Sequence, residues 1–429
     1  MNRYSLAFAV FVCALTAVSC GRSTADGASL SASSGPASLE EIAYAVLPNA
    51  KYSPPDETAT AATTVPQPIT ATSALFAVGT TNITLSVGTT RRVPVQLWYP
   101  AVESARAEAE AGRSVVEFEP PGPAREQWGR LIDQATPYFT QRTMYAAASP
   151  KSADDPARMP VVVISHCNEC LRFSYMRIAE QLAGHGFIVA APDHIDGTLY
   201  DAVNGTSVGL DMDDFLEQRR LDMFALTDAL LDPHAEVIPA DLRGRADPER
   251  VGMLGHSFGA ITTAYASTRD PRIKAIAILA MLVSLDNRLP YAGDRLAASV
   301  MLQPLSKPAL FVMAAEDRVG LLGINDILVD NFQNYPARAW LATIADTGHY
   351  SVSNLCGIVD SYTDGCGPGQ RTANLFETFT YLNLDYATDL TAQLVRSFFE
   401  EELNGASDAG FQEIATRAAS VLTVTEHRP

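Results

Sequence analysis

The pattern of hydrophobic and polar positions divides the chain into a polar N-terminal stretch and a folded body. Residues 21–73 are rich in Ser, Ala, Thr and Pro and have few large apolar side chains, which is typical of a flexible linker. Further along, the β-rich runs 83–87 and 93–99 flank a Gly-Thr-Thr-Arg turn and predict an antiparallel hairpin. Residues 101–158 are polar and partly helical, and we interpret them as an insertion.

From residue 160 onwards, short apolar runs alternate with helical patterns. Apolar side chains recur three and four positions apart in residues 175–183, as on one face of a helix, and further helices are expected at 257–268 and near 390–405. Continuous apolar runs predict strands buried on both faces, at 161–164, 187–191, 251–254, 273–279, 309–314 and 340–344. The repeated strand–helix units predict an α/β fold with a mostly parallel central sheet, the N-terminal hairpin and helices on both faces.

The first twenty residues predict an export signal. Arg3 precedes an apolar run, residues 6–18, that is too short for a stable membrane anchor. Small residues then lead to Cys20, as in bacterial lipoprotein signals whose cysteine is lipidated. We therefore expect a lipid-anchored protein of the bacterial cell envelope, with membrane contact only through that anchor. An ordinary secretory signal, giving a periplasmic or secreted protein, is the alternative.

Composition narrows the choice of partners. The chain has 429 residues, 47% of them hydrophobic and 19% charged, so it can bury a large core. Its formal net charge of −18 argues against binding nucleic acid or an anionic membrane through a basic surface. Nothing in the composition predicts an oligomeric state.

Four cysteines lie in the folded body: Cys167, Cys170, Cys356 and Cys366. An even number in an exported protein predicts two disulfides, for which three pairings are possible. We favour the pairings that are local in sequence, Cys167–Cys170 and Cys356–Cys366. A zinc site made of all four is the alternative, because the first pair has ligand spacing.

The sequence Gly255-His-Ser-Phe-Gly259 is the strongest chemical signal. A serine hydroxyl needs a base and an oxyanion site to act as a nucleophile, and a sharp strand-to-helix turn gives access to both. An apolar strand precedes Gly255 and a helical pattern follows Gly259. This context predicts Ser257 as a nucleophile and disfavours a serine in an ordinary turn.

A base and an acid are expected after Ser257 along the chain, the acid first. His349 follows the late strand 340–344, whereas His427 lies near a polar terminus, so we predict His349 as the base. Asp317 follows the strand 309–314 and is the predicted acid, with Glu316 and Asp286 as rivals.

The oxyanion would be bound by backbone N–H groups. One is expected from Phe258, directly after the nucleophile, and the other from the loop 165–172, where we choose Asn168. His166 and His256 are interpreted as packed supports of these turns.

Several segments together resemble the platelet-activating-factor acetylhydrolase-like and dienelactone-hydrolase-like branch of the α/β hydrolases: 92–100, 160–166, 186–194, 255–259 and 348–349. The resemblance covers roughly residues 75–405. It implies the α/β-hydrolase fold, with Ser257 as nucleophile and His349 as base. Two departures stand out. The acid of the animal acetylhydrolases corresponds to about Leu279 or Ala280 here, neither of which is acidic, and Cys167 replaces the glycine of a usual Ser-His-Gly loop.

These features predict a serine carboxylic ester hydrolase acting through an acyl-enzyme, without a metal or organic cofactor. The catalytic domain would span residues 74–429, with insertions at about 101–158 and 280–305, the second being a lid, an acyl pocket or a plain loop. The resemblance implies short-chain acyl esters or lipids as the substrates. A surface-anchored polyester or plant-ester hydrolase, a serine peptidase and a non-catalytic binding protein on the same scaffold are the alternatives.

Overall fold

The structure is a computed structural model that describes residues 74–207, 212–280, 305–319 and 324–429. The predicted signal with Cys20, the linker, the rival acid Asp286 and nearly all of the 280–305 insertion lie outside the described residues.

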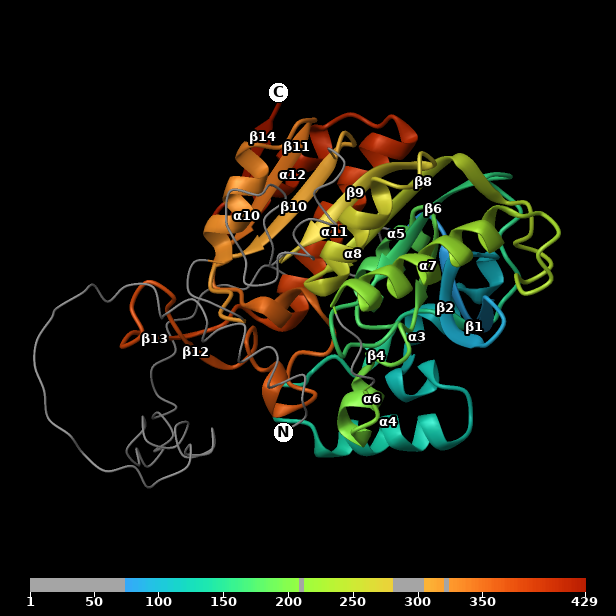
Figure 1. Ribbon diagram of the computed structural model, residues 1–429, viewed down its shortest axis with the longest axis horizontal. Coiled ribbons are helices and arrows are strands. Elements are labelled where there is room, and N and C mark those ends of the chain that lie inside the picture. The colour runs from blue at the N-terminus through green and yellow to red at the C-terminus, as the bar shows by residue number, and fades with distance from the viewer. Residues whose placement is uncertain (1–73, 208–211, 281–304, 320–323) are drawn as a thin grey trace, which may run out of the picture.

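A ten-stranded sheet runs through the molecule, in the order β14-β11-β10-β9-β8-β6-β7-β2-β1-β5 (Figure 1). Its six central strands are parallel and confirm the six predicted apolar runs: β6 (Met159–Ser165), β7 (Ile188–Pro192), β8 (Ala246–His256), β9 (Ile273–Leu279), β10 (Ala309–Ala314) and β11 (Ala339–Ile344). The predicted hairpin is also confirmed, by β1 (Ala77–Val87) and β2 (Arg91–Ala101). The short β5 (Ala147–Ala148) and the antiparallel β14 (Leu422–His427) form the two edges.

Helices cover both faces of the sheet, as the continuous apolar strands require. One face carries α7 (Met212–Leu231), α8 (Phe258–Ser267) and α10 (Ile324–Gln333). The other carries α5 (Met176–Gly184), α11 (Leu384–Asn404) and α12 (Ala409–Arg417). Each layer encloses its own cluster of buried apolar side chains, so the sheet lies between two cores.

The segment 101–158 consists of short elements: η3 (Glu103–Ala105), α3 (Arg106–Ala111), β3 (Arg113–Ser114), η4 (Val115–Phe118), α4 (Pro123–Gln134), β4 (Thr143–Met144) and β5. Two buried ion pairs connect it to the parallel sheet, because Arg172 pairs with Glu119 at 2.8 Å and with Asp193, which follows β7, at 2.5 Å. The segment is therefore packed against the loops at the carboxyl ends of β6 and β7.

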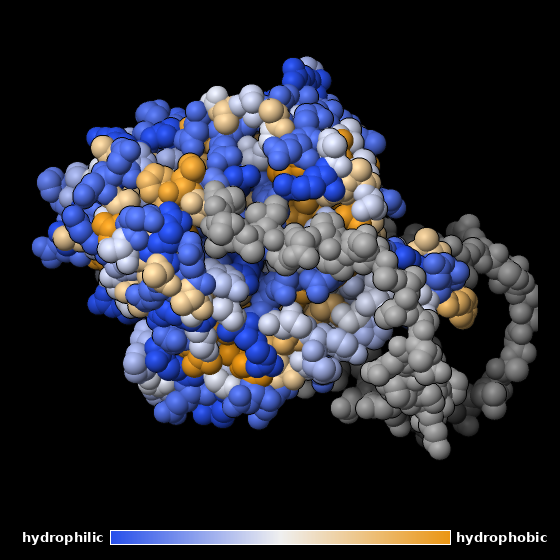
Figure 2. Space-filling view, turned by 180° about the vertical axis from the view of Figure 1, so that it is seen from behind, coloured by the Kyte–Doolittle hydropathy of each residue, from blue (hydrophilic) through white to orange (hydrophobic). Residues whose placement is uncertain are grey.

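The remaining elements are α6 (Leu199–Asn204) and the pieces of the segment before α11: η5 (His349–Val352), η6 (Asp360–Tyr362), β12 (Pro368–Gln370) and β13 (Thr378–Thr380). No helix in the described part of the chain is long and apolar enough to span a membrane. Seen from behind, the described surface is mainly hydrophilic, with apolar residues in small groups (Figure 2).

Candidate active site

Strand register brings four loops to one edge of the sheet. Ser165, the last residue of β6, pairs with Gly255 near the end of β8, and β10 and β11 end level with each other at Ala314 and Ile344. The loops that follow these strands contain all the residues predicted for catalysis. In open α/β sheets this carboxyl edge is where ligands bind.

Ser257 lies in a strained turn between β8 and α8. Its φ of 56° and ψ of −121° are unusual for a residue with a side chain and match the expected strand–elbow–helix arrangement. A Cβ on Gly255 would lie 2.0 Å from the carbonyl oxygen of Gly259, and one on Gly259 would lie 2.1 Å from that of Ser165. Both glycines are therefore required by close backbone contact.

The structure joins the predicted base to the predicted acid. Asp317 Oδ2 lies 2.8 Å from His349 Nδ1, and both side chains are almost fully buried. The backbone N–H of Val319 donates to the other carboxylate oxygen at 3.0 Å. The imidazole of His349 lies beside the elbow, with its ring 4.5 Å from that of His256. An Asp–His pair in this position can hold the tautomer in which Nε2 accepts a proton.

The rival acid Glu316 is engaged elsewhere. Its carboxylate accepts hydrogen bonds from Arg371 at 3.0 Å and from the backbone and hydroxyl of Thr372. Ala280 follows directly after β9 and has a φ of 45°, but its side chain has no carboxylate. Among the described carboxylates, Asp317 is thus the one hydrogen-bonded to the ring of His349.

The two proposed oxyanion donors lie in two different loops beside the elbow. Phe258 is the first residue of α8, where a backbone N–H has no acceptor within its own helix. Asn168 lies in the loop after β6 and borders a small hollow with Glu169, Asp196 and Phe215. The chain therefore offers backbone donors from both loops, as an oxyanion site requires.

The cysteines form the two sequence-local disulfides, Cys167–Cys170 and Cys356–Cys366, as predicted. The zinc alternative is wrong, because the sulfurs are bonded in pairs within two separate loops. Within the described ranges, no group of three or more His, Cys, Asp or Glu side chains is arranged to hold a metal ion.

The two histidines next to these turns are buried and hydrogen-bonded. His166 Nδ1 lies 2.7 Å from the Cys167 carbonyl oxygen, and its Nε2 accepts from the backbone N–H of His194 at 2.9 Å. His256 Nδ1 lies 2.8 Å from the Tyr175 hydroxyl. Burial lowers the pKa of both His166 and His256 well below the usual value, so both rings are neutral.

Sequence reasoning missed a second buried chain of polar groups beneath the elbow. Ser165 Oγ lies 3.0 Å from His194 Nε2, His194 Nδ1 lies 3.1 Å from Asp222, and Asp222 pairs with Arg91 at 2.9 Å. The Ala-Pro-Asp-His segment ending at His194 was the available signal, but Asp222 lies on α7, which the sequence pattern did not reveal. These hydrogen-bonded side chains hold the ends of β6 and β7 against α7.

Arg219, also on α7, is a further residue that sequence reasoning missed. It is fully buried, donates from Nη2 to the His166 carbonyl oxygen and lies over the ring of Phe258, 5.0 Å from its centroid. Burial lowers its pKa to about 9. Its positive charge thus lies directly behind both loops that carry the proposed oxyanion donors.

Parts of the chain are similar to known families and proteins. Residues 145–321 match the dienelactone hydrolase family, and residues 62–204 match the platelet-activating factor acetylhydrolase, isoform II, family. A platelet-activating factor acetylhydrolase of Canis lupus familiaris is 25% identical over 181 residues. The chain has the α/β-hydrolase fold. Parts of it are similar to the two families, the same two that its motifs resemble.

The same hydrolase fold occurs in a solved structure, the ferulic acid esterase from Streptomyces cinnamoneus. That match covers 85% of this chain and 99% of the esterase chain, with a TM-score of 0.55 and 19% sequence identity. The match to the canine relative covers 34% of this chain and 41% of that protein, so the chain spans less than half the length of this relative. These similarities establish the fold.

Proposed function

We propose that this protein is a serine carboxylic ester hydrolase that works through an acyl-enzyme on Ser257. The observation that carries the proposal is the buried hydrogen bond between Asp317 and His349, whose ring lies beside the strained elbow of Ser257. An acid–base pair held next to a nucleophile turn is the arrangement of serine hydrolases.

The proposed reaction has two halves. Ser257 Oγ attacks the ester carbonyl carbon while His349 takes the hydroxyl proton, and Asp317 stabilises the imidazolium that forms. The N–H groups of Phe258 and Asn168 bind the oxyanion, and the alkoxide leaves with the proton from His349. Water, deprotonated by His349, then releases the acid from Ser257. No metal or organic cofactor takes part in these steps.

For the substrate, we propose short-chain acyl esters or lipid esters. The matches to acetylhydrolase and dienelactone hydrolase families support small acyl groups. A polyester or plant ester is the alternative substrate class, and a panel of acyl chain lengths with one phospholipid, one polyester and one feruloyl ester separates them. We further propose, from the N-terminal sequence, that the enzyme is exported and anchored through Cys20.

The test is hydrolysis of p-nitrophenyl acetate and butyrate by protein lacking residues 1–20. We expect turnover by the wild type and loss of at least about 10³-fold in Ser257→Ala. Ser267→Ala is the matched control, because Ser267 is also buried in α8 and its hydroxyl donates to the Ala264 carbonyl oxygen at 2.9 Å. Equal turnover by Ser257→Ala would refute the mechanism. A wild type that neither turns over ester nor reacts with a fluorophosphonate would instead support a binding protein on this scaffold.

A further inference from the structure

The two disulfides lie in the two loops on which the proposed chemistry depends. The Cys167–Cys170 ring encloses Asn168 and Glu169, and so contains the proposed oxyanion donor. The Cys356–Cys366 ring lies in the segment that follows His349. We call these the first ring and the second ring.

One hydrogen bond joins the two rings. The hydroxyl of Tyr362, inside the second ring, donates to the backbone carbonyl oxygen of Glu169, inside the first ring. Tyr362 is only 4% exposed, and its ring stacks on that of Tyr350 at 4.4 Å. Burial raises the pKa of Tyr362 well above its ordinary value, so the hydroxyl keeps its proton and remains a donor.

The first ring is held at both neighbours of Asn168. The Cys167 N–H donates to the Tyr175 hydroxyl at 3.3 Å. Glu169 has a left-handed φ of 57°, its N–H donates to Gly197 at 2.9 Å, and its carbonyl accepts from Tyr362. Because a residue with a side chain does not favour this conformation, these bonds must maintain it. The direction of the Asn168 N–H depends on these neighbours.

The second ring holds the base through its backbone. Asp364 Oδ2 accepts from the His349 N–H at 3.0 Å, and the Asp364 carbonyl accepts from the Tyr350 N–H at 2.7 Å. The Gly365 carbonyl accepts from the Ser351 hydroxyl at 2.8 Å. The first three residues of the η5 turn, which begins with His349, are thus hydrogen-bonded to residues inside the second ring.

We propose that Tyr362 is a positioning residue that sets the oxyanion loop relative to His349, so that the two disulfide rings act as one unit. The effect of Tyr362 on catalysis rests on the proposed function, whereas the contact between Tyr362 and Glu169 does not depend on it. The unit contains the proposed oxyanion donor in one ring and the support of the base in the other.

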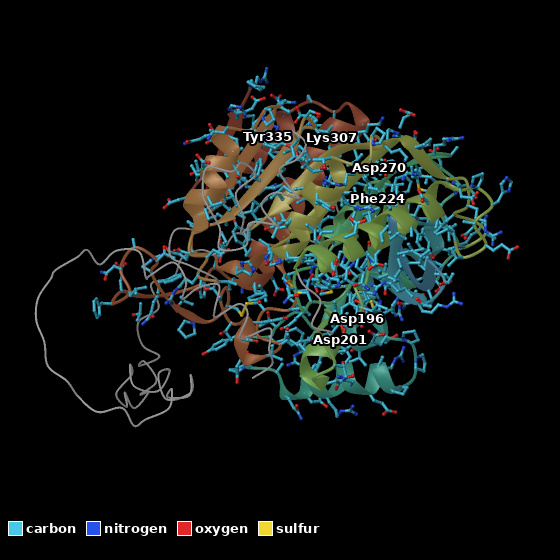
Figure 3. All side chains as sticks on the ribbon, viewed as in Figure 1. Asp196, Asp201, Phe224, Asp270, Lys307 and Tyr335 are labelled. Carbon is cyan, nitrogen blue, oxygen red and sulfur yellow. A yellow bond between two sulfur atoms is a disulfide. The ribbon has the colours of Figure 1, made fainter. Side chains whose placement is uncertain are left out.

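The test replaces Tyr362 by Phe, which removes only the hydroxyl. Tyr335→Phe is the matched control: Tyr335 is 2% exposed, and its hydroxyl donates to the Lys307 carbonyl oxygen at 2.9 Å. Figure 3 shows Tyr335 and Lys307 at the end of the molecule opposite Asp196, which borders the hollow beside the first ring. A general loss of stability would affect both variants alike.

Two measurements are made on each variant. In Tyr362→Phe we expect kcat for p-nitrophenyl butyrate to fall about tenfold, with KM and the pH midpoint of kcat/KM unchanged, because a displaced oxyanion donor acts on the transition state alone. We also expect faster hydrogen exchange of the amides of residues 165–172. Tyr335→Phe should change neither quantity by more than about twofold.

The proposal is overturned if Tyr362→Phe keeps kcat within about twofold of the wild type and exchanges these amides at the wild-type rate. If Tyr362→Phe does not fold, Cys356→Ser/Cys366→Ser, which opens the second ring, must show the same exchange pattern, and unchanged exchange overturns the proposal. A wild type without esterase activity would contradict the proposed function, whereas hydrogen exchange would still decide the role of Tyr362.

Discussion

Asp317 receives two hydrogen bonds, and they fix its orientation before any substrate arrives. His349 Nδ1 lies at 2.8 Å from one carboxylate oxygen and the Val319 N–H at 3.0 Å from the other. The neighbouring Glu316 points to Arg371 and Thr372 instead. Two adjacent carboxylates thus have different partners, and of the two only Asp317 faces the base.

This difference can be tested with Asp317→Asn and Glu316→Gln. The amide introduced by the first substitution can donate to Nδ1 and so favours the wrong imidazole tautomer, for which we expect kcat to fall about 10³- to 10⁴-fold. Glu316→Gln should leave kcat within about twofold, since Glu316 does not contact His349. Steady-state kinetics on p-nitrophenyl butyrate decides the assignment, and a larger loss in Glu316→Gln would reverse it.

At the scale of elements, the junction of β8 with α8 depends on the absence of side chains. A Cβ on Gly259 would lie 2.1 Å from the Ser165 carbonyl oxygen, which belongs to the backbone of β6 and cannot move aside. Gly129, in α4, has no atom within 4 Å of such a Cβ. The same substitution is therefore expected to have opposite effects at these two positions.

We predict that Gly259→Ala lowers the free energy of unfolding by about 3 kcal/mol or more, because backbone must shift to relieve the overlap. Gly129→Ala should raise it by about 0.5–1 kcal/mol, since alanine favours a helix interior. Urea denaturation followed by circular dichroism measures both. A Gly259→Ala protein of wild-type stability would contradict the close packing at the elbow.

Many of the helices and strands could be predicted from the sequence. The hairpin, the six parallel strands and the α8 helix are strongly periodic or continuously apolar, and all were predicted. Helix α7 was missed, because Arg219 and Asp222 are buried polar residues and interrupt its apolar pattern. Strand β14 was missed because its alternating part, Leu422 to Thr425, is short and is followed by the polar Glu426 and His427, and it becomes a strand by pairing with β11.

Some residues of the candidate site could also be predicted from the sequence, and others could not. Ser257, His349 and Asp317 could be found because strand ends and chain order restrict where a nucleophile, base and acid can lie. Tyr362 and Asp364 could not, because their contacts with Glu169 and His349 join loops that the sequence pattern does not place side by side. The disulfides were predicted as local pairs, but the hydrogen bond that joins their two rings followed only from the fold.

At the scale of the whole molecule, helices α5 and α11 are joined by a contact that depends on pH. His185 Nδ1 lies 2.8 Å from the Gln181 carbonyl oxygen, and its Nε2 accepts from Arg396 at 2.7 Å. Burial, together with the Arg396 charge, lowers the pKa of His185 to about 4. In the unfolded chain the value is about 6.5.

Because the folded pKa lies below the unfolded one, the unfolded state takes up a proton first as the pH falls, and stability is lost between about pH 6.5 and pH 4. We predict that His185→Gln loses about 1–2 kcal/mol less stability than the wild type between about pH 7 and pH 4.5. Chemical denaturation at both pH values measures this difference. Parallel losses in the two proteins would show that His185 does not contribute.

Because the disulfides lie in loops, the sheet and its helices do not need them to fold, whereas the loops of the candidate site are restrained by them. Neither bond links two strands of the sheet: one lies in the loop after β6 and the other in the segment that follows β11 and His349. In a compartment that keeps thiols reduced, the two cores could still assemble while the loops around the nucleophile lack their covalent restraint. If the proposed function holds, we expect the reduced protein to be folded but to hydrolyse esters more slowly than the oxidised protein.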